Sequence, residues 1–131
     1  MTRFERNAKA VFSLKIHLVW CAKYRKPVLV GPVEKRLKEL LHETAAEYEW
    51  AIEAMEIMPD HVHLLIAFDH RFAVAEIVNR LKGVTSRHMR AEFRELRSRL
   101  PTLWSRSYYA GTVGQVSEAT VRKYIESQKG Q

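Results

Sequence analysis

The chain is poor in cysteine and has no long apolar segment. Cys21 is the one cysteine among 131 residues, which excludes an intramolecular disulfide and a cysteine-based zinc cluster. No run of about 18 apolar residues occurs, and this excludes a helix that crosses a membrane. The first ten residues, MTRFERNAKA, contain charges and no apolar core, unlike a secretory signal peptide. We therefore expect a cytoplasmic protein without a membrane partner.

Acidic residues are also few relative to basic ones. The chain has 22 Lys and Arg against 15 Asp and Glu, which gives a net charge of +7. The excess is greatest between residues 80 and 106, where the basic residues are Arg80, Lys82, Arg87, Arg90, Arg94, Arg97, Arg99 and Arg106. Such a cluster is typical of a protein that binds a polyanion, most often nucleic acid, although a solvated helix face gives the same pattern.

The length of the chain predicts one domain, residues 1–131, and its hydrophobic periodicity predicts the α+β class. Strands are predicted over 11–22, 51–58 and 61–68, with a less regular one within 103–113. Helices are predicted over about 33–49, from 74 to 99, and from 117 to the end. The first six elements have the order β-α-β-β-α-β of a ferredoxin-like, or RRM-like, antiparallel sheet with helices on one face. The C-terminal helix is an addition to that arrangement.

Two histidines stand at the start of the third predicted strand, in the stretch MPDHVHLLI. Because side chains alternate along a strand, Val62 and Leu64 should face the helices, while His61 and His63 face the other side of the sheet. Two imidazoles in this position can share a transition-metal ion. Two surface histidines on a half-exposed sheet are the alternative, and a third ligand is needed to decide.

The last predicted helix presents Tyr124 and Gln128 one turn apart on the same face. Val121 and Ile125 form a neighbouring apolar pair that can seat the helix on the rest of the domain. A packed aromatic ring and a surface amide would give the same pattern, so the spacing alone does not assign a function.

Motifs spread over almost the whole chain resemble those of one known family. In chain order they are HLVWCAKYRKPVL at 17–29, PDHVHLL at 59–65, LKG at 81–83, LW at 103–104, SYY at 107–109 and KYIESQ at 123–128. Their joint order over residues 11–128 of a basic chain is similar to that of the HUH single-tyrosine transposases. These TnpA-type enzymes move small insertion sequences as single-stranded DNA.

The resemblance implies a role for each candidate residue. His61, His63 and Gln128 would bind a divalent metal ion, Mg²⁺ or Mn²⁺, and Tyr124 would be the nucleophile. The tyrosine would attack single-stranded DNA and form a 5′-phosphotyrosine, which the 3′-OH of a second strand would later reverse. Asp60 would either form a hydrogen bond to a metal ligand or simply shape the turn before His61.

The resemblance also implies the partners of the chain. Members of the family act as dimers, recognise hairpins near the ends of their element, and can share active sites between subunits. We expect a homodimer of this kind on single-stranded DNA with subterminal hairpins. The residues that could contact phosphates and bases are Lys23, Tyr24, Arg25, Lys82, Arg87 and Arg90.

Two alternatives fit parts of the sequence. One is a domesticated HUH endonuclease that cuts repeated palindromes without moving an element. The other is a non-catalytic module that binds single-stranded nucleic acid on a ferredoxin-like sheet. Modules of that kind usually display aromatic residues on the open sheet face, where this sequence places His61 and His63.

Overall fold

Strands and helices follow the predicted order along the chain. In the computed structural model, which describes residues 14–114 and 116–131, the elements are β1 (Leu14–Cys21), the short 3₁₀ helix η2 (Lys23–Arg25), α1 (Pro32–Glu47), β2 (Ala51–Met58), β3 (His61–Phe68), α2 (Val74–Glu92), α3 (Arg94–Arg99), β4 (Tyr109–Thr112) and α4 (Glu118–Ser127). The predicted first strand began at residue 11, and its residues 11–13 lie outside the described part of the chain.

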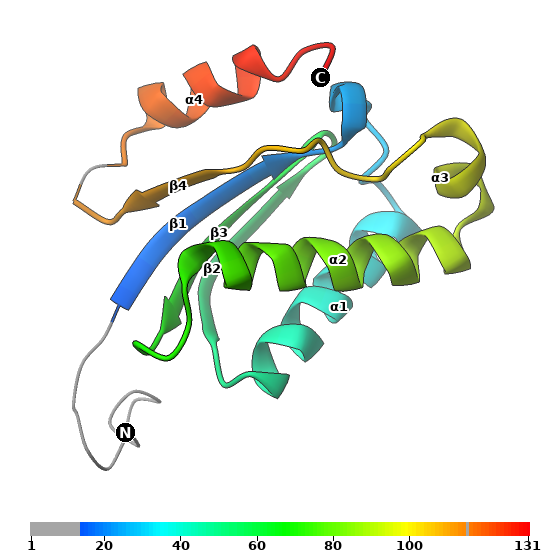
Figure 1. Cartoon of the computed structure of the whole chain (residues 1–131). Helices are drawn as coiled ribbons and strands as arrows, with labels where there is room; N and C mark the ends of the chain where they lie inside the picture. The colour runs from blue at the N-terminus through cyan, green and yellow to red at the C-terminus, as the bar shows by residue number, and fades with distance from the viewer. Residues whose placement is uncertain (1–13, 115) are drawn as a thin grey trace.

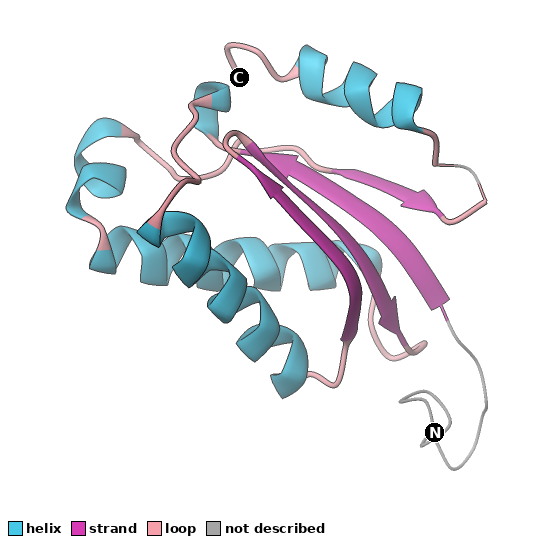
Figure 2. Cartoon of the chain, turned by 180° about the vertical axis from the view of Figure 1, so that it is seen from behind, coloured by secondary structure: helices cyan, strands magenta, loops and turns pink. Residues whose placement is uncertain are grey.

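The strands form one antiparallel sheet in the order β2-β3-β1-β4. Helices α1 and α2 lie along one face of this sheet, and α4 lies across the other face (Figures 1 and 2). The predicted ferredoxin-like fold is therefore confirmed. Met58 pairs with His61 across a two-residue turn, so Pro59 and Asp60 join β2 and β3 in an antiparallel hairpin.

The core lies between the sheet and the two helices that cover it. Leu18 and Trp20 of β1, together with Leu64 and Ile66 of β3, are completely buried on that face. Burial of a large apolar side chain contributes about 1.5–3 kcal/mol. The alternation that sends these residues inward is the same alternation that turns His61 and His63 to the opposite face.

The predicted helix from Val74 to Arg99 is interrupted. Phe93 has extended backbone angles, φ −118° and ψ 105°, and separates α2 from the short α3. The break allows Phe93 to pack against the core and buries Leu96 and Leu100. Tertiary burial has overridden a local sequence that is suited to one continuous helix.

Helix α4 begins as the sequence indicated. The Ser117 side chain accepts a hydrogen bond from the Thr120 backbone N–H at 3.1 Å, which satisfies one of the unpaired donors at the helix start. In the part of the chain that the structure describes, no helix is long and apolar enough to cross a membrane.

Candidate active site

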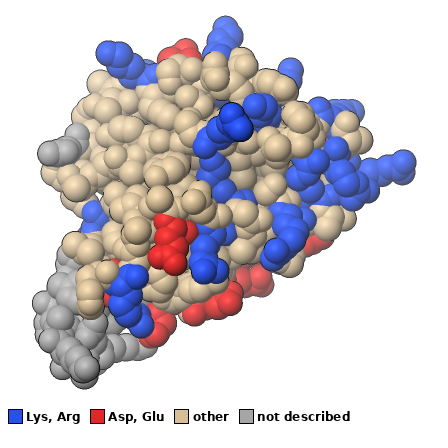
Figure 3. Space-filling model, in the orientation of Figure 1, with Lys and Arg blue, Asp and Glu red and all other residues tan. Residues whose placement is uncertain are grey.

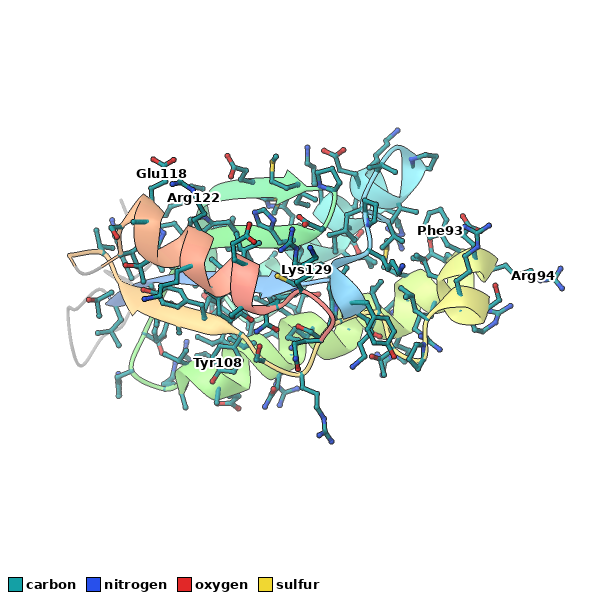
Figure 4. All side chains as sticks on the ribbon, turned by 90° about the horizontal axis from the view of Figure 1, so that it is seen from above. Phe93, Arg94, Tyr108, Glu118, Arg122 and Lys129 are labelled. Carbon is teal, nitrogen blue, oxygen red and sulfur yellow. The ribbon has the colours of Figure 1, made fainter. Side chains whose placement is uncertain are left out.

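A groove of about 880 Å³ lies between the sheet and α4. The sheet contributes His17, Met55, Met58, His61, His63 and Leu65 among others, and α4 contributes Glu118, Val121, Arg122 and Ile125. In Figure 4, Glu118 and Arg122 lie on the side of α4 that faces β2 and β3. The predicted histidine pair therefore lies in a concave site and not on a flat surface.

His61 is oriented by its neighbour in the β2–β3 turn. Its Nδ1 lies 2.8 Å from Asp60 Oδ1, so the hydrogen bond that the sequence left open is present. Burial raises the pKa of Asp60, but hydrogen bonds from His61 and Arg25 outweigh burial and bring the net pKa below its usual value. An ionised Asp60 accepts the Nδ1 proton, which leaves the lone pair of His61 on Nε2.

His63 has a third histidine as its neighbour. Its Nε2 lies 3.0 Å from Nδ1 of His17, on the adjacent strand β1. Burial, followed by repulsion from His17, lowers the pKa of His63 and favours the neutral ring, which is the form that binds metal. The sequence did not single out His17, because no local pattern predicts the register that pairs β1 with β3.

Tyr124 and Gln128 lie together on α4, as their spacing predicted. The Tyr124 hydroxyl is 2.8 Å from Ser107 Oγ, and the same Ser107 oxygen donates to Gln128 Oε1 at 2.8 Å. Ser105 Oγ donates to Gln128 Oε1 at 3.2 Å. Burial raises the pKa of Tyr124, and the hydrogen bond with Ser107 partly offsets that rise.

The structure brings the four candidate residues together in pairs and not as one cluster. Helix α4 turns Val121 and Ile125 toward the groove, whereas Tyr124 and Gln128 lie about a quarter turn around the helix, toward Ser107 and the ring of Tyr109. Among residues 14–114 and 116–131, no three His, Cys, Asp or Glu side chains are arranged to hold a metal ion. A metal site on His61 and His63 thus needs a ligand of another kind, such as an amide.

Sequence reasoning missed the segment that holds Tyr124 and Gln128. Ser105 and Ser107 precede β4, and Lys82 of α2 donates to the carbonyl oxygens of Ser105 at 2.7 Å and Ser107 at 3.1 Å. Burial lowers the pKa of Lys82 to about 8. In the sequence, these two regions are marked only by the LKG and SYY motifs that resemble the family's. No local pattern predicts that α2 contacts the segment before β4.

The residues predicted to contact DNA have different surroundings. Arg90 Nη1 donates to the Leu100 carbonyl at 2.8 Å, and Lys82 is bonded as described, so both already have acceptors within the chain. Arg87 is exposed on α2. The ammonium of Lys23 lies 5.0 Å from the centre of the exposed Tyr24 ring. Contacts of these residues with DNA remain predictions.

Known proteins resemble the chain along nearly its whole length. A model of the family described as "Transposase IS200 like" matches residues 10–128. The chain is 42% identical over 120 residues to the ISDra2 transposase TnpA of Deinococcus radiodurans, an alignment that covers 90% of this chain and 86% of that protein. It is 27% identical over 119 residues to the transposase for insertion sequence element IS200 of Salmonella typhimurium, with 89% and 78% covered.

Solved structures share the fold. The crystal structure of a putative transposase from Deinococcus radiodurans R1 superposes with a TM-score of 0.89 at 34% identity, covering 96% of this chain and 98% of that one. The structure of a REP-associated tyrosine transposase bound to a REP hairpin gives a TM-score of 0.58 at 10% identity, covering 86% and 62%. The second likeness supports the fold alone.

Proposed function

Because this chain belongs to the IS200-like transposase family and is an enzyme of that class, we propose that it cleaves and rejoins single-stranded DNA at the ends of an insertion sequence. The observation that carries the proposal is the pairing of the Tyr124 hydroxyl and the Gln128 amide on Ser107, on the helix that borders the histidine groove. The side chains of the proposed nucleophile and the proposed amide ligand thus lie on a surface next to the two imidazoles, which supports the proposal.

In the proposed reaction the Tyr124 oxygen attacks a backbone phosphorus. A bond from phosphorus to the tyrosine oxygen forms and the bond to the 3′ oxygen breaks, which leaves a 5′-phosphotyrosine and a free 3′-OH. The phenol loses its proton and the leaving oxygen takes one up, so protons and bonds balance. Because one phosphodiester replaces another, the 3′-OH of a second strand can reverse the step and join new ends without ATP.

Tyr124 needs help to ionise. Burial raises its pKa above an ordinary value near 10, so the resting side chain is a neutral phenol. Ser107 Oγ lies at hydrogen-bond distance, 2.8 Å, and its single proton, which the resting serine donates to Gln128 Oε1, can turn to the phenolate as the tyrosine proton leaves. The serine thus opposes the effect of burial at the atom where negative charge develops.

The two imidazoles and an amide oxygen suit Mn²⁺ better than Mg²⁺ by ligand softness, while Mg²⁺ is the more abundant ion. The hydrogen bond with Asp60 leaves a lone pair on Nε2 of His61, and the lowered pKa of His63 keeps that ring neutral. His61, His63 and Gln128 would hold the ion. Bound there, it would act as a Lewis acid on the phosphate that is cleaved.

We further propose that the enzyme works as a homodimer with shared active sites, on single-stranded DNA that carries subterminal hairpins. The arrangement of α4 supports this, because Tyr124 and Gln128 face the β4 side and not the groove of their own chain. A complete site then requires α4 to move or a second copy to supply it. The insertion-sequence role is favoured over the palindrome-cutting alternative because the 42% identical relative is an insertion-sequence transposase.

A covalent DNA adduct tests the proposal. The protein is incubated with Mn²⁺ and single-stranded DNA bearing its element's end, and the products are separated on a denaturing gel. Tyr124→Phe should abolish the adduct and leave DNA binding unchanged, and chelation of the metal should abolish it in the unaltered protein.

Tyr109→Phe is the matched control, because it removes a hydroxyl from the ring that packs 6.0 Å from Tyr124. This variant should still form the adduct. An adduct that survives Tyr124→Phe, or cleavage of duplex DNA as fast as of single strands, would contradict the proposal.

A further inference from the structure

Arg25 contacts both halves of the candidate active site. Its Nε donates to Asp60 Oδ2 at 3.1 Å, and its Nη1 donates to the Ile125 carbonyl of α4 at 3.3 Å. The side chains of Arg25 and Asp60 are only 23% and 22% exposed, so solvent screens their ion pair less than it screens one on the surface. One guanidinium therefore joins the turn before His61 to the helix that contains Tyr124.

The backbone that presents Arg25 is unusual. Tyr24 and Arg25 have φ values of 58° and 54°, in the left-handed region that bulky residues rarely adopt. The surrounding chain holds this turn in place, because the Ala22 N–H donates to the Asp60 carbonyl at 2.9 Å and the Tyr24 N–H donates to the Gln131 carbonyl at 3.2 Å. Backbone strain of this kind persists where several contacts enforce it, and it is concentrated at functional sites.

At one end, Arg25 fixes the carboxylate that orients His61. Asp60 accepts from His61 through Oδ1 and from Arg25 through Oδ2, so both oxygens are engaged and the group cannot rotate freely. A partner that holds the second ring nitrogen of a metal-binding histidine fixes its tautomer and its ring orientation. The orientation of His61 thus depends on Arg25 through Asp60.

At the other end, Arg25 fixes the last turn of α4. Ile125 follows Tyr124 directly, and its carbonyl already accepts a hydrogen bond from the Gln128 N–H at 3.1 Å, so Arg25 is a second donor to this oxygen at the end of the helix. A cation near a helix C-terminus is also favourable for the helix dipole. Glu126 adds a weaker attraction, with its Oε2 3.7 Å from Nη1 of Arg25.

We propose that Arg25 is a positioning residue that couples the orientation of the His61 ring to the seating of α4, and so to the place of Tyr124. The inference rests on the proposed function only for the roles of His61 and Tyr124. The coupling itself is a property of the protein without metal or DNA, and it can be measured there.

Two measurements test the coupling in the full chain. The ring ¹⁵N shifts of His61, recorded by NMR above about pH 8 where an imidazole is neutral, report which nitrogen has the proton. Amide hydrogen exchange of residues 121–125 reports how firmly α4 is seated. Arg25→Ala should convert His61 from one tautomer to a mixture and speed amide exchange about tenfold or more, the effect expected from loss of one charge-assisted hydrogen bond. Arg25→Lys keeps the charge but lacks the planar fork, so it should also lose one of the two contacts.

Lys26→Ala is the matched control, because it removes the same charge from the next, exposed residue of the turn. It should change neither signal. Asp60→Asn is a second test of the coupling. It changes the contact beside His61, and amide hydrogen exchange is measured in α4, where it should also become faster.

Unchanged exchange of α4 in Asp60→Asn would overturn the coupling, and so would an Arg25→Ala variant in which only one of the two signals moves. If the Tyr124→Phe protein still forms a DNA adduct, the proposed nucleophile is wrong while these results stand. The two failures are therefore distinguishable.

Discussion

At the scale of single residues, Ser107 has the most consequential contacts of the candidate site. Its hydroxyl lies between the Tyr124 phenol and the Gln128 amide, at 2.8 Å from each. Ser107→Ala should raise the pKa of Tyr124 further, because burial then acts without the opposing hydrogen bond. One hydrogen bond of about 0.5–1.5 kcal/mol corresponds to a rise of up to about one pH unit. Cleavage should be slower near neutral pH and should continue to rise to higher pH than in the unaltered enzyme, measured as adduct formation against pH.

Ser105→Ala is the control for this pH profile. Ser105 contacts the Gln128 amide at 3.2 Å but forms no hydrogen bond with Tyr124 within the described residues. It should lower the rate without moving the profile. If both serine variants shifted the pH profile equally, the pKa of the Tyr124 phenol would not depend specifically on the hydrogen bond with Ser107.

Single residues also show where sequence reasoning ends. Period-two alternation correctly placed His61 and His63 opposite the core, and helical spacing correctly paired Tyr124 with Gln128. The partners of these residues could not be predicted, because they are set by long-range contacts. His17 reaches His63 through strand register, and Ser107 reaches α4 through the path of a loop. The role of Arg25 depends on two left-handed backbone angles that no sequence pattern indicated.

At the scale of elements, the sequence predicted the order of strands and helices and the antiparallel sheet, but it predicted the ends of the helices less well. Strands β2 and β3 have the predicted bounds and meet at the Pro59–Asp60 turn, although the pairing of β2 with β3 shifts register between Ile52 and Ala54. The break at Phe93 was not predicted, because the residues on either side all favour a helix and only burial against the core separates them. Local pattern decides which elements form, whereas packing decides where they stop.

The end of α1 permits a prediction about stability. The Trp50 N–H donates to the Ala45 carbonyl at 2.9 Å and the Glu49 N–H donates to Ala46 at 3.2 Å, which is the Schellman pattern, with Glu49 at the position where glycine is usual. Glu49 has φ 60° and is exposed. Glu49→Gly should therefore raise the free energy of unfolding by about 0.5–1 kcal/mol, measured by urea denaturation.

Ala46→Gly is the matched change inside the same helix. It introduces glycine where the backbone is already helical, so it should lower the free energy of unfolding by about 1 kcal/mol. Opposite signs for the two glycine variants would establish that the left-handed conformation of Glu49 costs stability. A loss of similar size in both would contradict it.

At the scale of the whole molecule, the net charge of +7 is unevenly distributed. Figure 3 shows Lys and Arg gathered over the part of this face where α2 and α3 lie in Figure 1, and acidic side chains toward the lower edge. Such a surface attracts the phosphate backbone of a nucleic acid, whatever its base sequence. DNA affinity can depend on this local basic surface or only on the total charge of the chain.

Salt dependence separates these possibilities. For single strands, the logarithm of affinity falls with the logarithm of salt concentration with a slope of about −0.7 for each phosphate neutralised. If Arg87 on α2 contacts a phosphate, Arg87→Gln should make the slope shallower by about 0.7 and weaken binding to all single-stranded sequences alike. Lys38→Gln removes the same charge from α1, where Lys38 pairs with Glu34 at 3.1 Å, and should leave the slope unchanged. Fluorescence anisotropy between about 50 and 200 mM salt measures both. Equal changes in the two variants would mean that total charge, and not the α2–α3 surface, governs DNA binding.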